Sequence, residues 1–209
     1  MRIVIIGATG FVGKEVVREA LQRGYSVTAF ARNTKPFEEL AQANLKLMDG
    51  DVLNYHDLLV ATRGQDAVIS AFSTANTKGT TVMSQGTRHL LQAMHDNGLK
   101  RLISLSSAGV LGNDAPWVFT KIIVPFTLRH VFKDKRVQFH LVAQSGIDWT
   151  LVRPTEIIPK PVVGQLIISD DTPKADKIGV QAVAAFLVDQ LTDSTYVHKA
   201  PIIAVKPGK

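Results

Sequence analysis

The sequence contains no cysteine. This excludes a disulfide framework, a thiolate metal site, a cysteine nucleophile and a Cys-x-x-Cys redox pair. No apolar run reaches the roughly 18 residues that a membrane-spanning helix requires, and the apolar stretch at the N-terminus is too short for the core of a signal peptide. We therefore expect a soluble, cytoplasmic chain that does not associate with a membrane.

Acidic residues are fewer than basic ones: 18 Asp and Glu against 24 Lys and Arg give a net charge of +6. Such a chain can attract nucleic acid, acidic lipid or a phosphorylated small molecule. No aromatic pattern of a nucleic-acid stacking platform accompanies the basic residues. We expect no nucleic-acid partner, a weak positive field that attracts an anionic ligand, and a solvated helix face for the densest basic cluster, which comprises Lys121, Arg129, Lys133, Lys135 and Arg136.

The 209 residues are enough for one domain, and 45% of them are apolar, which excludes a disordered chain. Short apolar runs predict strands at residues 2–6, 25–31, 45–48, 67–72, 101–105, 149–153 and 202–205. Amphipathic stretches predict helices at residues 11–23, 80–97 and 178–191. Strands that alternate with helices indicate an α/β fold with a doubly wound parallel sheet and helices on both faces.

The first predicted strand ends in a glycine-rich turn, Gly7-Ala8-Thr9-Gly10-Phe11-Val12-Gly13. Gly7 permits the sharp turn, Gly10 lets the backbone approach a pyrophosphate, and Gly13 lets the following helix pack closely. The helix N-terminus then offers free N–H groups to the phosphates, with Thr9 as the expected N-cap. Because the turn joins a strand to an amphipathic helix, it predicts a dinucleotide site.

The end of the second predicted strand indicates which dinucleotide binds. An NAD site usually places Asp or Glu here to bind the ribose 2′-hydroxyl, but this chain has Arg32, with Lys35 close behind. A guanidinium can bind a 2′-phosphate through two hydrogen bonds, so NADP is expected rather than NAD. Asp51 and Val52 are expected to contact the adenine, although such residues are also common in helix-capping turns. The histidines form no metal-binding pair, and we expect no metal site.

Ser106 and Ser107 follow the fifth predicted strand, where they would face the nicotinamide end of the cofactor. This arrangement resembles the short-chain dehydrogenase/reductase superfamily, whose familiar members pair such a serine with Tyr-x-x-x-Lys. No tyrosine of this chain precedes a lysine at that spacing, and the nearest remnant is Trp117-x-x-x-Lys121. Indole is not an acid at neutral pH. Trp117 and Lys121 are assigned to a substrate pocket, with packing in the core as the commoner alternative for the tryptophan.

The chain also resembles a narrower group, the biliverdin-IXβ reductase/flavin reductase family of atypical short-chain reductases. The similar segments are residues 64–69, 81–86, 106–108 and 145–154, together with the glycine-rich start, Arg32 and the turn at residues 50–52. The resemblance covers nearly the whole chain. It implies one NAD(P)-binding Rossmann domain over residues 1–209, with a small substrate-side portion at about residues 150–209.

The resemblance, joined to the argument from the residues, assigns the site. The expected cofactor-binding residues are Gly7, Thr9, Gly10, Phe11, Val12, Gly13, Arg32, Lys35, Asp51, Val52, Phe72, Ser73, Thr74, Ser106, Pro154 and Thr155. Ser107 and Glu156 are the expected catalytic residues. Glu156 stands where the vertebrate-type enzyme has a histidine, which weighs against biliverdin as the acceptor.

Hydride transfer from NADPH to a flavin requires no protein acid, only close positioning of the two rings. We therefore expect an NADPH-dependent reductase that acts on FMN, riboflavin or another small conjugated acceptor, such as a quinone or a biliverdin-like tetrapyrrole. A monomer and a homodimer are both compatible with the sequence. The missing tyrosine favours one alternative, a non-catalytic NADP(H)-binding redox sensor that regulates a protein partner. A nucleic-acid-binding protein is a distant third.

Overall fold

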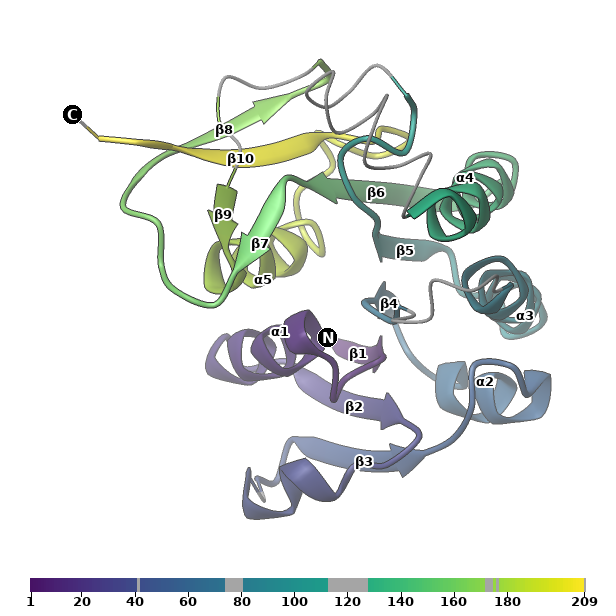
Figure 1. Cartoon of the computed structure of the whole chain (residues 1–209). Helices are drawn as coiled ribbons and strands as arrows, with labels where there is room; N and C mark the ends of the chain where they lie inside the picture. Colours follow the sequence, from purple (N-terminus) through teal and green to yellow (C-terminus); the bar gives the residue numbers. More distant parts are fainter. Residues whose placement is uncertain (41, 74–80, 113–127, 172–174, 176, 209) are drawn as a thin grey trace.

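The computed structural model describes residues 1–40, 42–73, 81–112, 128–171, 175 and 177–208. Its main element is an eight-stranded sheet (Figure 1). The strand order is β3 (Leu45–Asp49), β2 (Ser26–Ala31), β1 (Arg2–Ile6), β4 (Ala67–Ser70), β5 (Arg101–Leu105), β6 (Asp148–Pro154), β10 (Ile202–Pro207) and β8 (Gly164–Ser169). The order 3-2-1-4-5-6 is that of a doubly wound Rossmann sheet, which confirms the predicted α/β single-domain fold.

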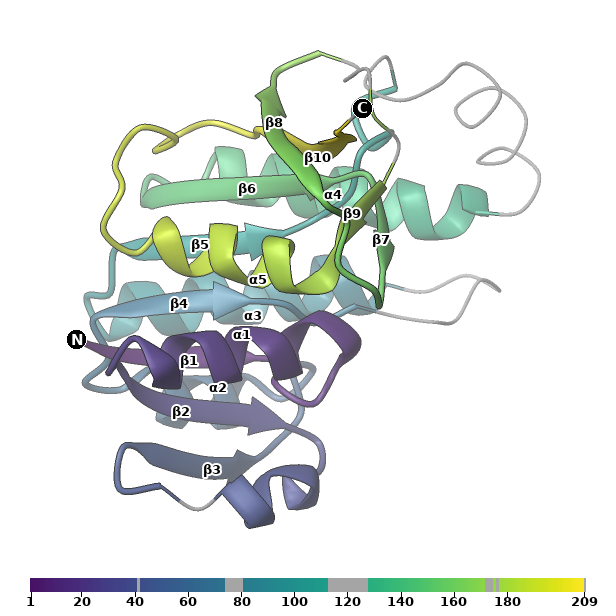
Figure 2. The same ribbon diagram turned by 90° about the vertical axis from the view of Figure 1, so that its left-hand side faces the viewer.

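The strands β1 to β6 run parallel, and Figure 2 shows them pointing the same way. The central strands β1 and β4 are buried along nearly their whole length. Strands that are covered on both faces need continuous apolar runs rather than alternation. For this reason the apolar runs in the sequence locate these strands to within two residues at either end.

Helices cover both faces of the sheet (Figure 1). One face carries α1 (Phe11–Gln22) and α5 (Val180–Asp189), and the other carries α2 (Tyr55–Thr62), α3 (Val82–Asp96) and α4 (Arg129–Ala143). The side chains of β1 divide between two cores, with Ile5 under α1 and α5 and Val4 under the other helices. No bounds are predicted from the sequence for α4, where only a basic helix face was expected, nor for α2 and the short 3-10 helix Lys35–Leu40.

The structure differs from the sequence-based expectations in three details. The sheet is not purely parallel, because β8 pairs antiparallel with β10; β8 is an edge strand, where antiparallel pairing tolerates one solvated face. The late helix begins at Val180, because residues 177–179 form strand β9 (Lys177–Gly179), which pairs with β7 (Glu156–Ile158). Gly10, not Thr9, is the N-cap of α1, and no side chain caps that helix.

In the described part of the chain, no helix is both long enough and apolar enough to span a bilayer. The substrate-side role of residues from about 150 onward stays a prediction, as do the cytoplasmic location and the oligomeric state.

We expect Gly13→Ala to lower the free energy of unfolding. A Cβ atom at Gly13 would lie 2.2 Å from the carbonyl oxygen of Gly7 and 2.8 Å from that of Ala8, and both neighbours are backbone atoms. Overpacking of this kind costs roughly 1–3 kcal/mol, which urea denaturation can measure. The control Lys14→Ala changes the next residue of the same helix and should alter stability by less than about 0.5 kcal/mol. Equal midpoints for the two variants would contradict the close packing of α1 on the glycine turn.

Candidate functional site

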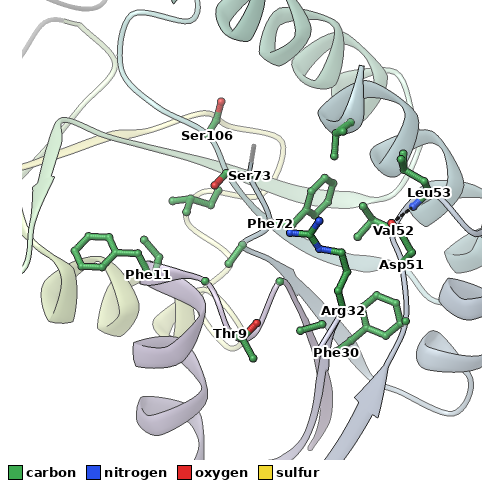
Figure 3. Close-up of a pocket in the computed structure, with 18 of the residues that line it drawn as sticks. Thr9, Phe11, Phe30, Arg32, Asp51, Val52, Leu53, Phe72, Ser73 and Ser106 are labelled. Atoms are coloured by element: carbon green, nitrogen blue, oxygen red, sulfur yellow. Dashed lines mark hydrogen bonds between the residues drawn. The ribbon is translucent and has the colours of Figure 1, made fainter. Parts of the chain in front are cut away.

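A cavity of about 640 Å³ lies at the carboxyl ends of β1, β2, β4 and β5 (Figure 3). Ligands of doubly wound sheets bind at this edge. Most of the residues predicted to form the site line this cavity: Gly7, Thr9, Gly10, Phe11, Val12, Arg32, Asp51, Val52, Phe72, Ser73, Ser106 and Ser107.

Other predicted site residues do not line the cavity. Gly13 is buried within α1, and Lys35 is exposed at the start of the 3-10 helix. Pro154 and Thr155 bind other backbone groups: the carbonyl oxygen of Pro154 accepts the N–H of Ala108 at 2.9 Å, and the N–H of Thr155 donates to the carbonyl oxygen of Ile203 at 3.1 Å. The contacts of these four residues with a cofactor stay predictions.

Glu156, the second predicted catalytic residue, is the exposed first residue of β7. Its neighbour Ile157 lines the cavity, and successive side chains of a strand point to opposite faces. The carboxylate of Glu156 therefore points away from the cavity wall that Ile157 forms. Thr74, Trp117 and Lys121 lie outside the described residues.

The glycine turn is fixed by the two neighbouring strand ends. The N–H groups of Gly7 and Ala8 both donate to the carbonyl oxygen of Phe30, at 2.9 and 3.1 Å. Gly7 has a φ of +80°, and a Cβ atom there would lie 2.6 Å from the Cα atom of Phe72. Both the backbone angle and the close approach therefore require glycine.

The N-terminal end of α1 opens toward the cavity. Its first helical hydrogen bond runs from the N–H of Lys14 to the carbonyl oxygen of Gly10, at 3.0 Å. The N–H groups of Phe11 and Val12 come before that bond, so the helix itself leaves them free for an anion. A pyrophosphate fits here because Gly10 places no side chain in its path.

Arg32 extends from the end of β2 into the cavity (Figure 3). Its side chain is exposed and has no partner among the described residues. The loop beneath it is held by Thr34, whose N–H and Oγ1 both donate to Oδ1 of Asp49 at 2.8 Å. These hydrogen bonds lower the pKa of the Asp49 carboxyl. An unpaired guanidinium on a fixed loop is suited to binding a phosphate.

The turn after β3 is also preorganised. Oδ1 of Asp51 accepts the N–H of Leu53 at 2.9 Å, and the N–H of Asp51 donates to Oδ2 of Asp57 at 2.9 Å. The Asp51 carboxylate therefore stabilises its own turn, as expected of a residue in a helix-capping turn. Val52 and Leu53 line the cavity. The adenine contact stays a prediction.

Lys135 of α4 also lines the cavity, although the sequence predicted it on a solvated helix face. Its Nζ lies 3.1 Å from Oγ of Ser107, to which it donates a hydrogen bond. Burial lowers the pKa of the Lys135 ammonium to about 8, because a low-dielectric environment disfavours the charged form. The expectation of a solvated helix face holds for Arg129, Lys133 and Arg136, which are exposed, and is wrong for Lys135.

A signal for Lys135 was present in the sequence. Val131, Gln138 and Val142 are buried on α4, and Lys135 lies four residues after the first of them and three before the second. This is the spacing of one helix face. A lysine on the buried stripe of a helix is uncommon unless a local partner binds its head group.

A cofactor would also find a free hydrogen-bonding group on β5. Oγ of Ser106 is buried, lines the cavity and has no hydrogen-bond partner in the described part of the chain. Buried hydroxyls are normally paired. Together with the open helix end and the unpaired Arg32, this orphaned hydroxyl shows that the residues present fit a dinucleotide.

A family model described as NAD(P)H-binding matches residues 7–194 of the chain. The photosystem II assembly factor Ycf39 of Synechocystis is 27% identical over 109 residues, which are 51% of this chain and 33% of that protein. The chain therefore spans a third of the length of this relative.

Two solved structures share the fold over nearly their whole length. A short-chain dehydrogenase/reductase from Veillonella parvula in complex with NADP has a TM-score of 0.85 at 18% identity, and the match covers 99% of this chain and 95% of that one. ChuY, an anaerobillin reductase from Escherichia coli O157:H7, has a TM-score of 0.80 at 18% identity, with coverage of 100% and 99%. At these identities the likeness establishes the fold.

The lowered pKa of Lys135 can be measured in the protein without any ligand. We expect one lysine side-chain NMR signal to titrate near pH 8, with the charged ammonium below that pH and the neutral amine above it. The signal should be missing from Lys135→Met and present in Lys133→Met, which changes an exposed lysine on the same helix. A Lys135 signal that stays fully charged at pH 9.5 would contradict the burial of the ammonium.

Proposed function

Because the chain belongs to the NAD(P)H-binding family, we propose that it is an NADPH-dependent reductase that transfers hydride to a flavin or a similar conjugated acceptor. The observation that carries this proposal is the hydrogen bond between Lys135 and Ser107 in the cavity that also contains the glycine turn. The likeness to atypical short-chain reductases, ChuY among them, supports it. The acceptor is a small molecule, and we retain the cytoplasm and a monomer or homodimer as expectations.

The chain would hold NADPH along the strand ends. The turn from Gly7 to Gly10 and the N–H groups of Phe11 and Val12 would bind the pyrophosphate. Arg32 would bind the 2′-phosphate, and the Veillonella neighbour with bound NADP supports this choice of dinucleotide. The nicotinamide would then lie at the end of β5, beside the orphaned Ser106 hydroxyl and Ser107.

NADPH supplies the hydride when it is bound. The residues of the chain have two tasks, which are to place the acceptor against the nicotinamide and to provide a proton. A hydride and a proton together balance the two-electron reduction of the acceptor. Lys135 can supply the proton, because an acid with a pKa of about 8 is partly charged and partly neutral near physiological pH. Ser107 accepts the hydrogen bond that orients the ammonium.

The pair of Lys135 and Ser107 bears on the choice between an enzyme and a non-catalytic sensor, which the missing Tyr-x-x-x-Lys left open. The absence of the tyrosine donor left a non-catalytic sensor as the main alternative. A half-buried lysine with a lowered pKa, at the end of the cavity where the nicotinamide would lie, favours catalysis over sensing. It also widens the acceptors to those whose reduced form must be protonated.

The choice of NADPH over NADH is tested with Arg32→Ala. Loss of a charge-assisted hydrogen bond costs roughly 1.5–3 kcal/mol, so we expect the Kd of NADPH to rise about 10- to 100-fold. The Kd of NADH should change little, because NADH lacks the 2′-phosphate. Titration calorimetry measures both constants, and Arg63→Ala, an exposed arginine outside the cavity, is the control. Equal losses for the two nucleotides would refute the assignment of Arg32.

The reductase activity is tested by following NADPH absorbance with FMN, riboflavin and a quinone as acceptors. We expect turnover with at least one acceptor. With an acceptor whose reduced form must be protonated, such as the quinone, Lys135→Met should lose roughly 100-fold or more in kcat, because a positioned acid typically contributes that much; with a flavin, which needs no protein acid, the loss should be smaller. Lys133→Met should retain the wild-type rate. Tight NADPH binding without turnover of any acceptor would contradict the proposal and favour the NADP(H)-binding sensor.

A further inference from the structure

The residue next to Lys135 is a buried carboxylate that faces a different helix. Asp134 is only 5% exposed. Its Oδ2 accepts the N–H of Met83 at 2.9 Å, and its Oδ1 accepts the N–H of Ser84 at 3.1 Å. Both donors belong to the first turn of α3, so one side chain of α4 satisfies two N–H groups at the end of a neighbouring helix.

Helix α3 has no side-chain cap of its own. Thr81 occupies its N-cap position and makes no capping hydrogen bond through its side chain. The first N–H groups of any helix need partners from outside the helical ladder, and a carboxylate at this end also interacts favourably with the helix dipole. Asp134 therefore caps α3 from another helix, and it adds two hydrogen bonds to the apolar packing of α4 on α3.

The rest of this stretch of α4 is tied to the β5 side of the cavity. Lys135 donates to Ser107 at 3.1 Å, Nε of Arg136 donates to the carbonyl oxygen of Val110 at 2.8 Å, and Nε2 of Gln138 lies 3.4 Å from Oγ of Ser104. Of these anchors on α4, only Asp134 points to α3. Its loss would remove the hydrogen bonds that help to set how closely this turn of α4 approaches the cavity, while the apolar packing of α4 on α3 would remain.

Asp134 directs its carboxylate to α3 rather than to Lys135. Both carboxylate oxygens are bound by α3, and burial is the cause that lowers the pKa of Lys135. The other charged groups of α4, and those of the elements that pack against it, α3 and β6, are engaged elsewhere or solvated. Arg136 donates to the carbonyl oxygen of Val110, and Lys133 is exposed. On α3, Arg88 is exposed and His89 contacts the carbonyl oxygen of Val52. On β6, Asp148 pairs with His198, and Arg153 donates to the carbonyl oxygen of Ala200.

We propose that Asp134 is a positioning residue, which holds α4 against the N-terminal end of α3 and thereby keeps the Lys135 ammonium buried on Ser107. Its role in catalysis rests on the proposed reductase function, whereas its effect on the position of Lys135 does not. Because Val82, the first residue of α3, lines the cavity, the same tie connects the wall of the cavity to the lysine.

The test compares the full-length protein with Asp134→Asn. An amide has the same shape but only one acceptor oxygen, so its NH₂ group would face a backbone N–H donor and at least one anchor would be lost. We expect the Lys135 titration midpoint, measured by NMR without ligand, to rise from about 8 toward 10.5 as the ammonium becomes hydrated. We expect kcat to fall at least about tenfold, since small misplacements of a reacting group are costly, while the Kd of NADPH stays unchanged.

Two further variants make the result interpretable. Asp193→Asn is the matched control, because Asp193 also accepts a backbone N–H, that of Thr195 at 2.8 Å, and does not line the cavity; it should leave the Lys135 midpoint and kcat unchanged. Asp134→Glu keeps the carboxylate but lengthens the tie by one methylene. It should therefore raise the midpoint less than Asp134→Asn, and it provides the measurement if the amide variant does not fold.

An unchanged Lys135 midpoint in a folded Asp134 variant would overturn the proposal, and a loss of thermal stability alone would then make Asp134 a purely structural cap. The failure of the proposed function has a different signature. In that case no acceptor is reduced by the wild-type protein, whereas the ligand-free titration still shows whether Asp134 sets the position of Lys135.

Discussion

Two backbone N–H groups, those of Gly7 and Ala8, share one acceptor, the carbonyl oxygen of Phe30. These two hydrogen bonds join the turn after β1 to the end of β2. The N–H of Ala71, bound to Ile6 at 2.9 Å, joins β1 to the segment after β4 in the same way. The start of α1, the Arg32 loop and the chain after β4 therefore have fixed positions relative to one another. The cavity exists because three strand ends are held at the same level.

The features that could be predicted from the sequence are those whose causes are local. A strand buried on both faces must be apolar throughout, so the run from Ile3 to Ile6 identifies β1 without any knowledge of its partners. A turn that approaches a neighbouring backbone requires glycine, so Gly7 and Gly13 reveal the dinucleotide loop. For these reasons the glycine turn and Arg32 were found at the cavity from sequence alone.

The features that were missed depend on contacts between distant parts of the chain. Ser107 and Lys135 are 28 positions apart, and no local pattern states that α4 packs beside the end of β5. The edge strand β8 is half-exposed and weakly patterned, and its direction is set by β10, which follows it by more than thirty residues. The Tyr-x-x-x-Lys spacing is matched most nearly by Trp117 and Lys121, whereas the lysine that binds Ser107 follows no such spacing and lies on α4.

The position of β10 has a consequence for the order in which the chain folds. The last strand of the chain lies between β6 and β8, and β8 pairs with no other strand in the described residues. During synthesis the nucleotide half of the sheet, β1 to β6, can therefore assemble while β8 still has no partner. The sheet becomes complete only when the C-terminal residues arrive and insert between two strands that were made earlier. Until then β6 is an exposed edge, which is the kind of strand that pairs with other chains.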